Sequence, residues 1–245
     1  MLMKRQDVLP APLPGAATQA AQQILEFKID RLQSRRTAIE FFTPQNYEPG
    51  YAYPLVVWLH GPGDNERQLR RVMPLTSTRN YVAAAPRAPR HDGATAGMTF
   101  RWDQKQRDID VAAARVLQTV RVAEKRYNIH PQRIFLAGYL GGGAMAIRLA
   151  LRNPELFAGA ASIGGGFPQG CSPLARLSEA RSLPMLMIHL QQSERYPESK
   201  LCEDLRLLHT AGMKIDLHQY LCGDELSTDM FEDLNRWLMQ KVTGG

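Results

Sequence analysis

This 245-residue sequence has few cysteines and no long apolar run. Its three cysteines, Cys171, Cys202 and Cys222, are odd in number and form no Cys-x-x-Cys pair. This usage argues against a disulfide framework or a zinc site, and it favours a reducing compartment. No apolar run approaches the ~20 residues that a membrane helix needs. We therefore expect a cytoplasmic protein without a membrane span.

The sequence also lacks a recognisable nucleic-acid-binding motif, although its net charge is +6 and its pI is about 9.4. The basic residues are scattered, so we interpret them as a solvated surface and expect no nucleic-acid partner. The glycine runs at 141–143 and 164–166 are not followed by the lysine of a phosphate-binding loop. We therefore expect no cofactor.

The chain is long enough, and with 44% hydrophobic residues apolar enough, for one large domain. Residues 1–22 are rich in Ala, Pro and Gln and predict a flexible tail, which leaves 23–245 as the domain. Residues 25–30 alternate between apolar and polar side chains, and 38–42 is the predicted partner strand of a hairpin. Residues 54–59 are continuously apolar, which is typical of a central strand covered on both faces.

Strands and helices alternate after this apolar run. Further strands are predicted at 81–85, 133–137, 158–163, 184–189 and 214–221, and helices at 109–127, 142–152, 197–209 and 228–242. The pattern predicts an α/β fold: a mostly parallel sheet of about eight strands, an antiparallel N-terminal hairpin, and helices on both faces.

Residues 138–142 read Gly-Tyr-Leu-Gly-Gly. This is the frame of the Gly-x-Ser-x-Gly turn, which lifts a nucleophilic serine clear of a sheet between a strand and a helix. Leu140 holds the position of the serine. An isobutyl group has no proton to give up and no lone pair with which to attack.

Several segments together carry a family resemblance. The segment Pro54 to Asp64 resembles the apolar strand and His-Gly-x-Gly-Asp loop of α/β-hydrolases, specifically the phospholipase/carboxylesterase and acyl-protein-thioesterase branch. The likeness continues through 84–89, 102–103, 133–139, 157–159, 184–197 and 233–237, and it covers about residues 24–242. The resemblance implies the α/β-hydrolase fold and a triad in the chain order Ser, Asp, His.

At the positions that match the family's triad, this sequence has none of the three expected catalytic residues. Ser193 falls where the acid belongs. Glu194 follows it one residue late and has two interpretations, a replacement acid or an ordinary solvated glutamate. Asp224 occupies the place of the histidine, and no histidine follows His218. An aspartate with a pKa of about 4 is a poor general base near neutral pH.

The oxyanion hole implied by the resemblance is also incomplete. Its first donor falls on Pro62, which has no N–H, so only Gly141 remains as a donor. Other residues expected near the cleft are His60, Gly61, Trp102, Tyr139 and Glu194, with the side chain of Tyr139 directed away from the cleft.

Three acids, Asp64, Asp103 and Asp224, are candidates for a weak cation site at the mouth of the cleft. Scattered acids more often cap helices or meet water, so we expect no metal. Ser162 is interpreted as a packing or loop serine, because it lacks the sharp turn of a nucleophile.

Three functions remain open at this point. The first is a non-catalytic relative of the hydrolases, a pseudoenzyme that binds an apolar or acyl-type small molecule in the former cleft or acts as a scaffold. The second is a weak or altered hydrolase of carboxyl esters or thioesters, since a site without its triad still accelerates hydrolysis by about 10³–10⁴ in the best case. The third is a structural module. The coordinated losses favour the first.

Overall fold

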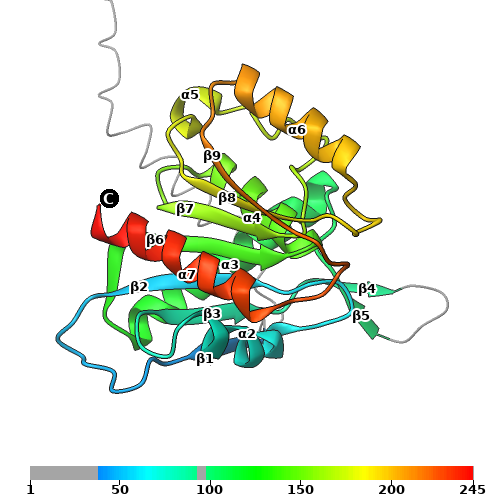
Figure 1. The fold of residues 1–245 in the computed structure, drawn as a ribbon. Helices are drawn as coiled ribbons and strands as arrows, with labels where there is room; N and C mark the ends of the chain where they lie inside the picture. Colours follow the sequence, from blue (N-terminus) through cyan, green and yellow to red (C-terminus); the bar gives the residue numbers. More distant parts are fainter. Residues whose placement is uncertain (1–37, 93–97, 245) are drawn as a thin grey trace, which may run out of the picture. The chain divides into compact units, whose positions relative to one another are not determined.

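The computed structural model describes residues 38–92 and 98–244. It contains a seven-stranded sheet in the order β1-β3-β2-β6-β7-β8-β9 (Figure 1). The strands are β1 (Ile39–Phe42), β2 (Tyr53–Leu59), β3 (Val82–Pro86), β6 (Ile129–Tyr139), β7 (Gly159–Ile163), β8 (Met185–Leu190) and β9 (Ile215–Tyr220). The pair β1–β3 is antiparallel, and the other neighbours are parallel. The predicted fold class is confirmed. The predicted tail at 1–22 and strand at 25–30 lie outside the described residues.

Helices cover both faces of this sheet (Figure 1). They are η1 (Glu66–Gln68), α2 (Leu69–Thr76), α3 (Gln106–Arg126), α4 (Gly141–Arg152), α5 (Leu177–Ala180), α6 (Glu198–Thr210) and α7 (Thr228–Thr243). Strand β2 shows why both faces must be covered, because successive side chains of a strand point to opposite sides. Leu55, Val57 and Leu59 join the core under α3, α4 and α6. Val56 and Trp58 join the core under α2 and α7.

Some short elements were not predicted from the sequence. Helix α2 contains Pro74 in its interior, which is a helix-breaking signal in a segment of eight residues. Strands β4 (Arg90–Asp92) and β5 (Met98–Phe100) form a separate antiparallel pair of three residues each. Elements this short carry too few residues for periodicity to identify them.

The parallel strands bring several loops to one edge of the sheet. β2, β6, β8 and β9 run in the same direction, so the segments that follow their carboxyl ends meet there. Those segments carry Pro62, Leu140, Ser193 and Asp224, the four positions that the sequence singled out. In the described ranges, no helix combines the length and the apolar character that crossing a membrane requires.

Candidate functional site

The turn between β6 and α4 keeps a strained backbone around Leu140. β6 ends at Tyr139 and α4 begins at Gly141. Leu140 has φ 48° and ψ −118°, a positive φ that costs a residue with a side chain about 1–3 kcal/mol. Its amide donates to the Ile163 carbonyl at 2.8 Å, and its own carbonyl accepts from the Ala144 amide at 3.0 Å. The turn therefore has the shape that presents a nucleophile, with a leucine at its apex.

The glycines on both sides of Leu140 allow this turn to pack against β2. A β-carbon on Gly142 would lie 2.2 Å from the Leu59 carbonyl oxygen and 2.5 Å from that of His60. A β-carbon on Gly138 would lie 2.6 Å from the backbone of Gly142. Both contacts are with backbone atoms, which have little freedom to move away. The glycine frame is therefore a packing requirement, whatever residue stands at 140.

The side chain of Leu140 belongs to the hydrophobic core. It is 7% exposed and lies in the same cluster as Ile163 and Leu190. A β-carbon on Gly164 would come within 3.0 Å of Leu140 Cδ2. The isobutyl group therefore fills space at the apex of the turn.

Ser193 and Asp224 are in direct contact at the same edge of the sheet. Ser193 Oγ donates to Asp224 Oδ1 at 2.5 Å. Arg195 completes the cluster, because its Nε donates to Asp224 Oδ2 at 2.8 Å and its amide donates to Ser193 Oγ at 3.3 Å. Both carboxylate oxygens of Asp224 are thus occupied by donors. The Asp224 side chain is therefore held in place by Ser193 and Arg195.

Sequence reasoning missed Arg195 and considered its neighbour Glu194 instead. Glu194 is exposed, and Arg195 makes the contact with Asp224. The available signal was charge: a cation two residues after the acid position faces an aspartate at the histidine position.

Tyr139 bridges the Asp224 loop and the loop after β2, so the prediction that its side chain points away from the candidate site is wrong. Its hydroxyl donates to the backbone carbonyl of Asp224 at 2.6 Å. Its ring lies against Gly61, where a β-carbon would be 2.4 Å from the ring. Burial, followed by the negative charge of Asp224, raises the pKa of Tyr139 to about 12. The hydroxyl therefore stays protonated at neutral pH and acts as a donor to the loop.

The loop after β2 offers few free amides. The Gly61 amide donates to Gln68 Oε1 at 3.2 Å, and the Asp64 amide donates to the Gly61 carbonyl at 3.3 Å. Pro62 between them has no N–H. Gly141 begins α4, where the first amides have no partner four residues back. The Gly61 and Asp64 amides of this loop are thus engaged, whereas the amides at the start of α4 have no partner within the helix.

His60 is a structural residue of this loop. It is fully buried, and its Nε2 accepts from the Ala88 amide at 3.1 Å, so the proton sits on Nδ1 and is donated to the Gly61 carbonyl at 2.8 Å. Burial lowers the pKa of His60 and keeps the ring neutral. Trp102 Nε1 donates to the His60 carbonyl at 3.1 Å. Both rings hold the loop in place.

The remaining candidates have separate partners. Asp64 pairs with Arg71, and Asp103 pairs with Arg101 at 2.7 Å, so these acids are not gathered around a cation with Asp224. Across the described residues, no group of three or more metal-ligating side chains comes together. Ser162 is fully buried and donates to the Gly165 carbonyl at 2.7 Å. His218 bonds to Asp233 at 2.5 Å.

Comparisons with known proteins identify the family of this chain. The family model described as phospholipase/carboxylesterase matches residues 49–241. A rice protein (Oryza sativa subsp. japonica) named "probable inactive carboxylesterase" is 27% identical over 209 residues, which are 75% of this chain and 82% of that protein. The protein NocK of Nocardia uniformis subsp. tsuyamanensis is 30% identical over 138 residues, 56% of this chain, but the match spans only 39% of NocK.

Solved structures show the same fold at lower identity. Arabidopsis thaliana SOBER1 superposes with a TM-score of 0.65 at 19% identity, over 78% of this chain and 100% of that one. Zea mays acyl-protein thioesterase 2 superposes with a TM-score of 0.64 at 18% identity, over 84% of this chain and 100% of that one.

Proposed function

The chain belongs to the phospholipase/carboxylesterase family of α/β-hydrolases, and from that membership we propose that it is a member without serine-hydrolase activity. The observation that carries the proposal is the contact of Ser193 with Asp224 beside a turn whose apex is Leu140. In an active member of this fold, an acid and a histidine meet in this way beside a serine. The contact supports the assignment of Ser193 to the position of the acid and of Asp224 to the position of the histidine. Neither residue can perform the role of the one it replaces.

The chemistry of each missing group supports the proposal separately. Leu140 has no nucleophilic atom. The buried histidines of the core hold backbone groups: His60 through Gly61 and Ala88, and His189 through the Tyr196 carbonyl at 3.0 Å. Loss of a triad nucleophile alone costs about 10⁶ in kcat, and loss of one oxyanion donor costs about 10²–10³. Combined, these losses leave no route through an acyl-enzyme.

We extend the proposal to the ligand class. Leu140 makes the apex of the turn apolar, and Arg195, whose side chain is 63% exposed, presents a positive charge beside Ser193 and Asp224. An apolar chain with a polar or acidic head matches that combination, so an acyl-type small molecule is the proposed ligand. A relative in fold, the maize protein, is named an acyl-protein thioesterase. The cytoplasmic location indicated by cysteine usage stays a prediction.

The direct test is a fluorophosphonate probe with assays on p-nitrophenyl acetate and butyrate. The wild-type protein should remain unlabelled and should hydrolyse both esters no faster than a Ser162→Ala variant, which removes a buried hydroxyl outside the turn. An active serine esterase of the same family serves as the positive control. Labelling of the wild type, or a kcat/KM within a few decades of that control, contradicts the proposal.

Ligand binding is tested separately with a fluorescent medium-chain fatty acid. Saturable binding that weakens in Arg195→Gln, with Arg206→Gln on α6 as the control, supports the acyl ligand. If Arg195→Gln binds the fatty acid as tightly as the wild type does, the ligand lies elsewhere. If the wild type does not bind the fatty acid, the proposed ligand class is wrong, and the proposal of missing hydrolase activity is unaffected.

A further inference from the structure

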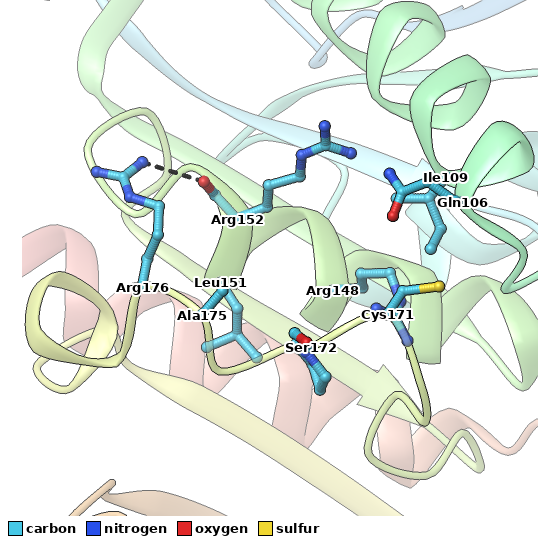
Figure 2. Close-up of a pocket in the computed structure, with 10 residues that line it drawn as sticks. Gln106, Ile109, Arg148, Leu151, Arg152, Cys171, Ser172, Ala175 and Arg176 are labelled. Carbon is cyan, nitrogen blue, oxygen red and sulfur yellow. Dashed lines mark hydrogen bonds between the residues drawn. The ribbon is translucent and has the colours of Figure 1, made fainter.

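A pocket lies away from the Leu140 turn, beside the C-terminal half of α4. Its volume is about 210 Å³, and Figure 2 shows the side chains around it. Among its lining residues are Arg148, Arg152, Cys171, Pro173, Ala175 and Arg176. The lining thus includes three guanidinium groups and no carboxylate. We refer to it as the arginine pocket.

Arg148 is the unusual member of the arginine pocket. It is 3% exposed, yet its hydrogen-bond partners among the described residues are all neutral oxygens: the Gln104 side chain at 2.5 Å and the carbonyls of Gln169 and Gly170 at 2.7 and 3.0 Å. In the part of the chain that the structure describes, no carboxylate lies within ion-pair distance of it. Burial lowers the pKa of Arg148, as expected for a charge removed from water. A buried charge without a counter-ion is costly.

The other two arginines already have counter-ions outside the pocket lining. Arg152 pairs with Asp110 at 2.7 Å, and Arg176 pairs with Glu155 at 2.9 Å. Arg176 also donates to the Arg152 carbonyl at 3.1 Å, the contact dashed in Figure 2. These ion pairs fix the outer arginines in position at the pocket without neutralising Arg148.

The wall opposite α4 has an unusual backbone. Gly170, Cys171 and Ser172 have φ values of 70°, 49° and 45°. Two of these residues carry side chains, for which a positive φ costs about 1–3 kcal/mol each. Bonds from Arg148 to the carbonyls of 169 and 170 hold the strained segment against the pocket. The pocket is therefore a built feature rather than a gap between loops.

We propose that the arginine pocket binds a small organic carboxylate. The carboxylate would supply the counter-charge that Arg148 lacks, through a charge-assisted bond from Nη1, because Nε and Nη2 already donate to Gln104, Gln169 and Gly170. Half-buried Pro173 and exposed Ala175 contribute apolar surface for a short hydrocarbon body, which inorganic anions do not have. Arg148 lies eight residues after Leu140 on α4, about 12 Å along the helix axis. The site is thus separate from the turn and independent of the proposed function.

Cys171 provides a reporter, since its thiol is exposed and lines the pocket. The experiment measures the iodoacetamide alkylation rate of each cysteine by peptide mass spectrometry in the full-length protein. Butyrate and benzoate should slow alkylation of Cys171 saturably and leave exposed Cys202 on α6 unaffected. Sodium chloride and sodium phosphate at equal ionic strength should not protect Cys171, and neither should the neutral analogues 1-butanol and benzyl alcohol.

Two variants test the contribution of the guanidinium groups. Arg148→Gln should raise the carboxylate concentration for half-protection about tenfold or more, as expected for loss of a charged hydrogen bond. Because Arg148 also anchors the 169–170 segment, Arg152→Gln is the second variant and should raise it several-fold. Arg107→Gln, outside the lining, should have no effect.

Three results would overturn the carboxylate site. One is absence of protection by either carboxylate at tens of millimolar. Another is equal protection by chloride, phosphate or the alcohols. The last is a carboxylate concentration for half-protection of Cys171 that is the same in Arg152→Gln as in the wild type.

Discussion

Ser193 and Asp224 share a 2.5 Å hydrogen bond across two loops that are 31 residues apart in the chain. Considered alone, Ser193 at the position of the acid and Asp224 at the position of the histidine are each an ordinary polar substitution. Their contact makes them a pair, because the loops after β8 and β9 deliver them to the same point. The pair also determines which substitutions would be needed to rebuild a triad.

The first prediction concerns that rebuilding. Leu140→Ser alone should remain unlabelled by a fluorophosphonate, because His60, whose backbone packs against the turn, has both ring nitrogens bonded to backbone groups and cannot take the proton. The triple change Leu140→Ser, Ser193→Asp and Asp224→His should label, since the new carboxylate and imidazole would replace two side chains that already touch. Gel fluorescence with a heat-denatured control measures this. Labelling of the single variant would show that another base serves the turn.

Pro62 sets the level of activity in that background. Adding Pro62→Gly to the triple variant restores an amide in the loop, and one oxyanion donor is worth about 10²–10³ in kcat. Because Gly63 already has a positive φ, a second glycine also loosens the loop, so we expect a gain at the lower end of this range. An unchanged kcat for p-nitrophenyl butyrate would place the oxyanion elsewhere.

The second prediction compares adjacent glycines of the turn. Gly142→Ala should lower the free energy of unfolding by more than about 2 kcal/mol, because its β-carbon would overlap the carbonyl oxygens of Leu59 and His60. Gly141→Ala is the matched control: the nearest atom to its β-carbon, the Trp102 carbonyl oxygen, is 4.0 Å away. It should be neutral or slightly stabilising. Urea unfolding of both variants is the measurement, and equal losses would contradict the packing argument.

The third prediction concerns strain at position 140. Leu140→Ala and Leu140→Gly both remove the buried isobutyl group, but only glycine adopts a φ of 48° without cost. Leu140→Gly should therefore be more stable than Leu140→Ala by about 1 kcal/mol. At Ala144, inside α4, the order should reverse, and Ala144→Gly should cost about 0.5–1 kcal/mol. Urea midpoints decide the order, and an alanine variant at 140 that matches or exceeds the glycine variant would remove the strain argument.

The fourth prediction concerns pH. Glu66 is buried, and Arg87 binds both of its carboxylate oxygens at 2.6 Å. Burial opposes ionisation of Glu66, but the bonds from Arg87 outweigh it and lower the pKa below the usual 4.5. The stabilisation is therefore present above pH 4.5 and is lost as pH falls through the lower folded-state value.

Glu66→Gln measures this contribution. At pH 7 the variant should lose about 1–3 kcal/mol of unfolding free energy, and the difference from wild type should shrink below about pH 4. The control Glu203→Gln removes an exposed ion pair with Lys200 and should change stability little at any pH. A Glu66→Gln difference that stays constant from pH 7 to pH 3 would contradict the assignment.

Much of the fold follows from local pattern. The continuous apolar run at 54–59 identifies β2, because a strand between two helical layers has no polar face. The four-and-three spacing of apolar residues likewise identifies α3, found at Gln106–Arg126. The glycine frame identifies the turn at Leu140 because only glycine permits the approach to Leu59. In each case the sequence pattern arises from packing that the fold itself requires: burial of a strand on both faces, burial of one helix face, or close backbone approach at a turn.

The features of the site that could not be predicted are side-chain contacts between residues that are far apart in the sequence. The Gly61 amide is taken by Gln68 from the helix start that follows, and no spacing rule distinguishes Gln68 from any surface glutamine. Arg195 reaches Asp224 from another loop. The unpaired charge of Arg148 depends on which carboxylates are absent around it, a property of the assembled structure alone.

The bond from Tyr139 to the carbonyl of Asp224 has a consequence for how this site can change. A main-chain acceptor is the same for every amino acid, so the anchor survives any replacement at position 224. The side chain at position 224 can therefore be replaced while Tyr139 keeps the backbone of the loop in place. The same property makes the chain a practical scaffold for installing new chemistry by side-chain replacement alone.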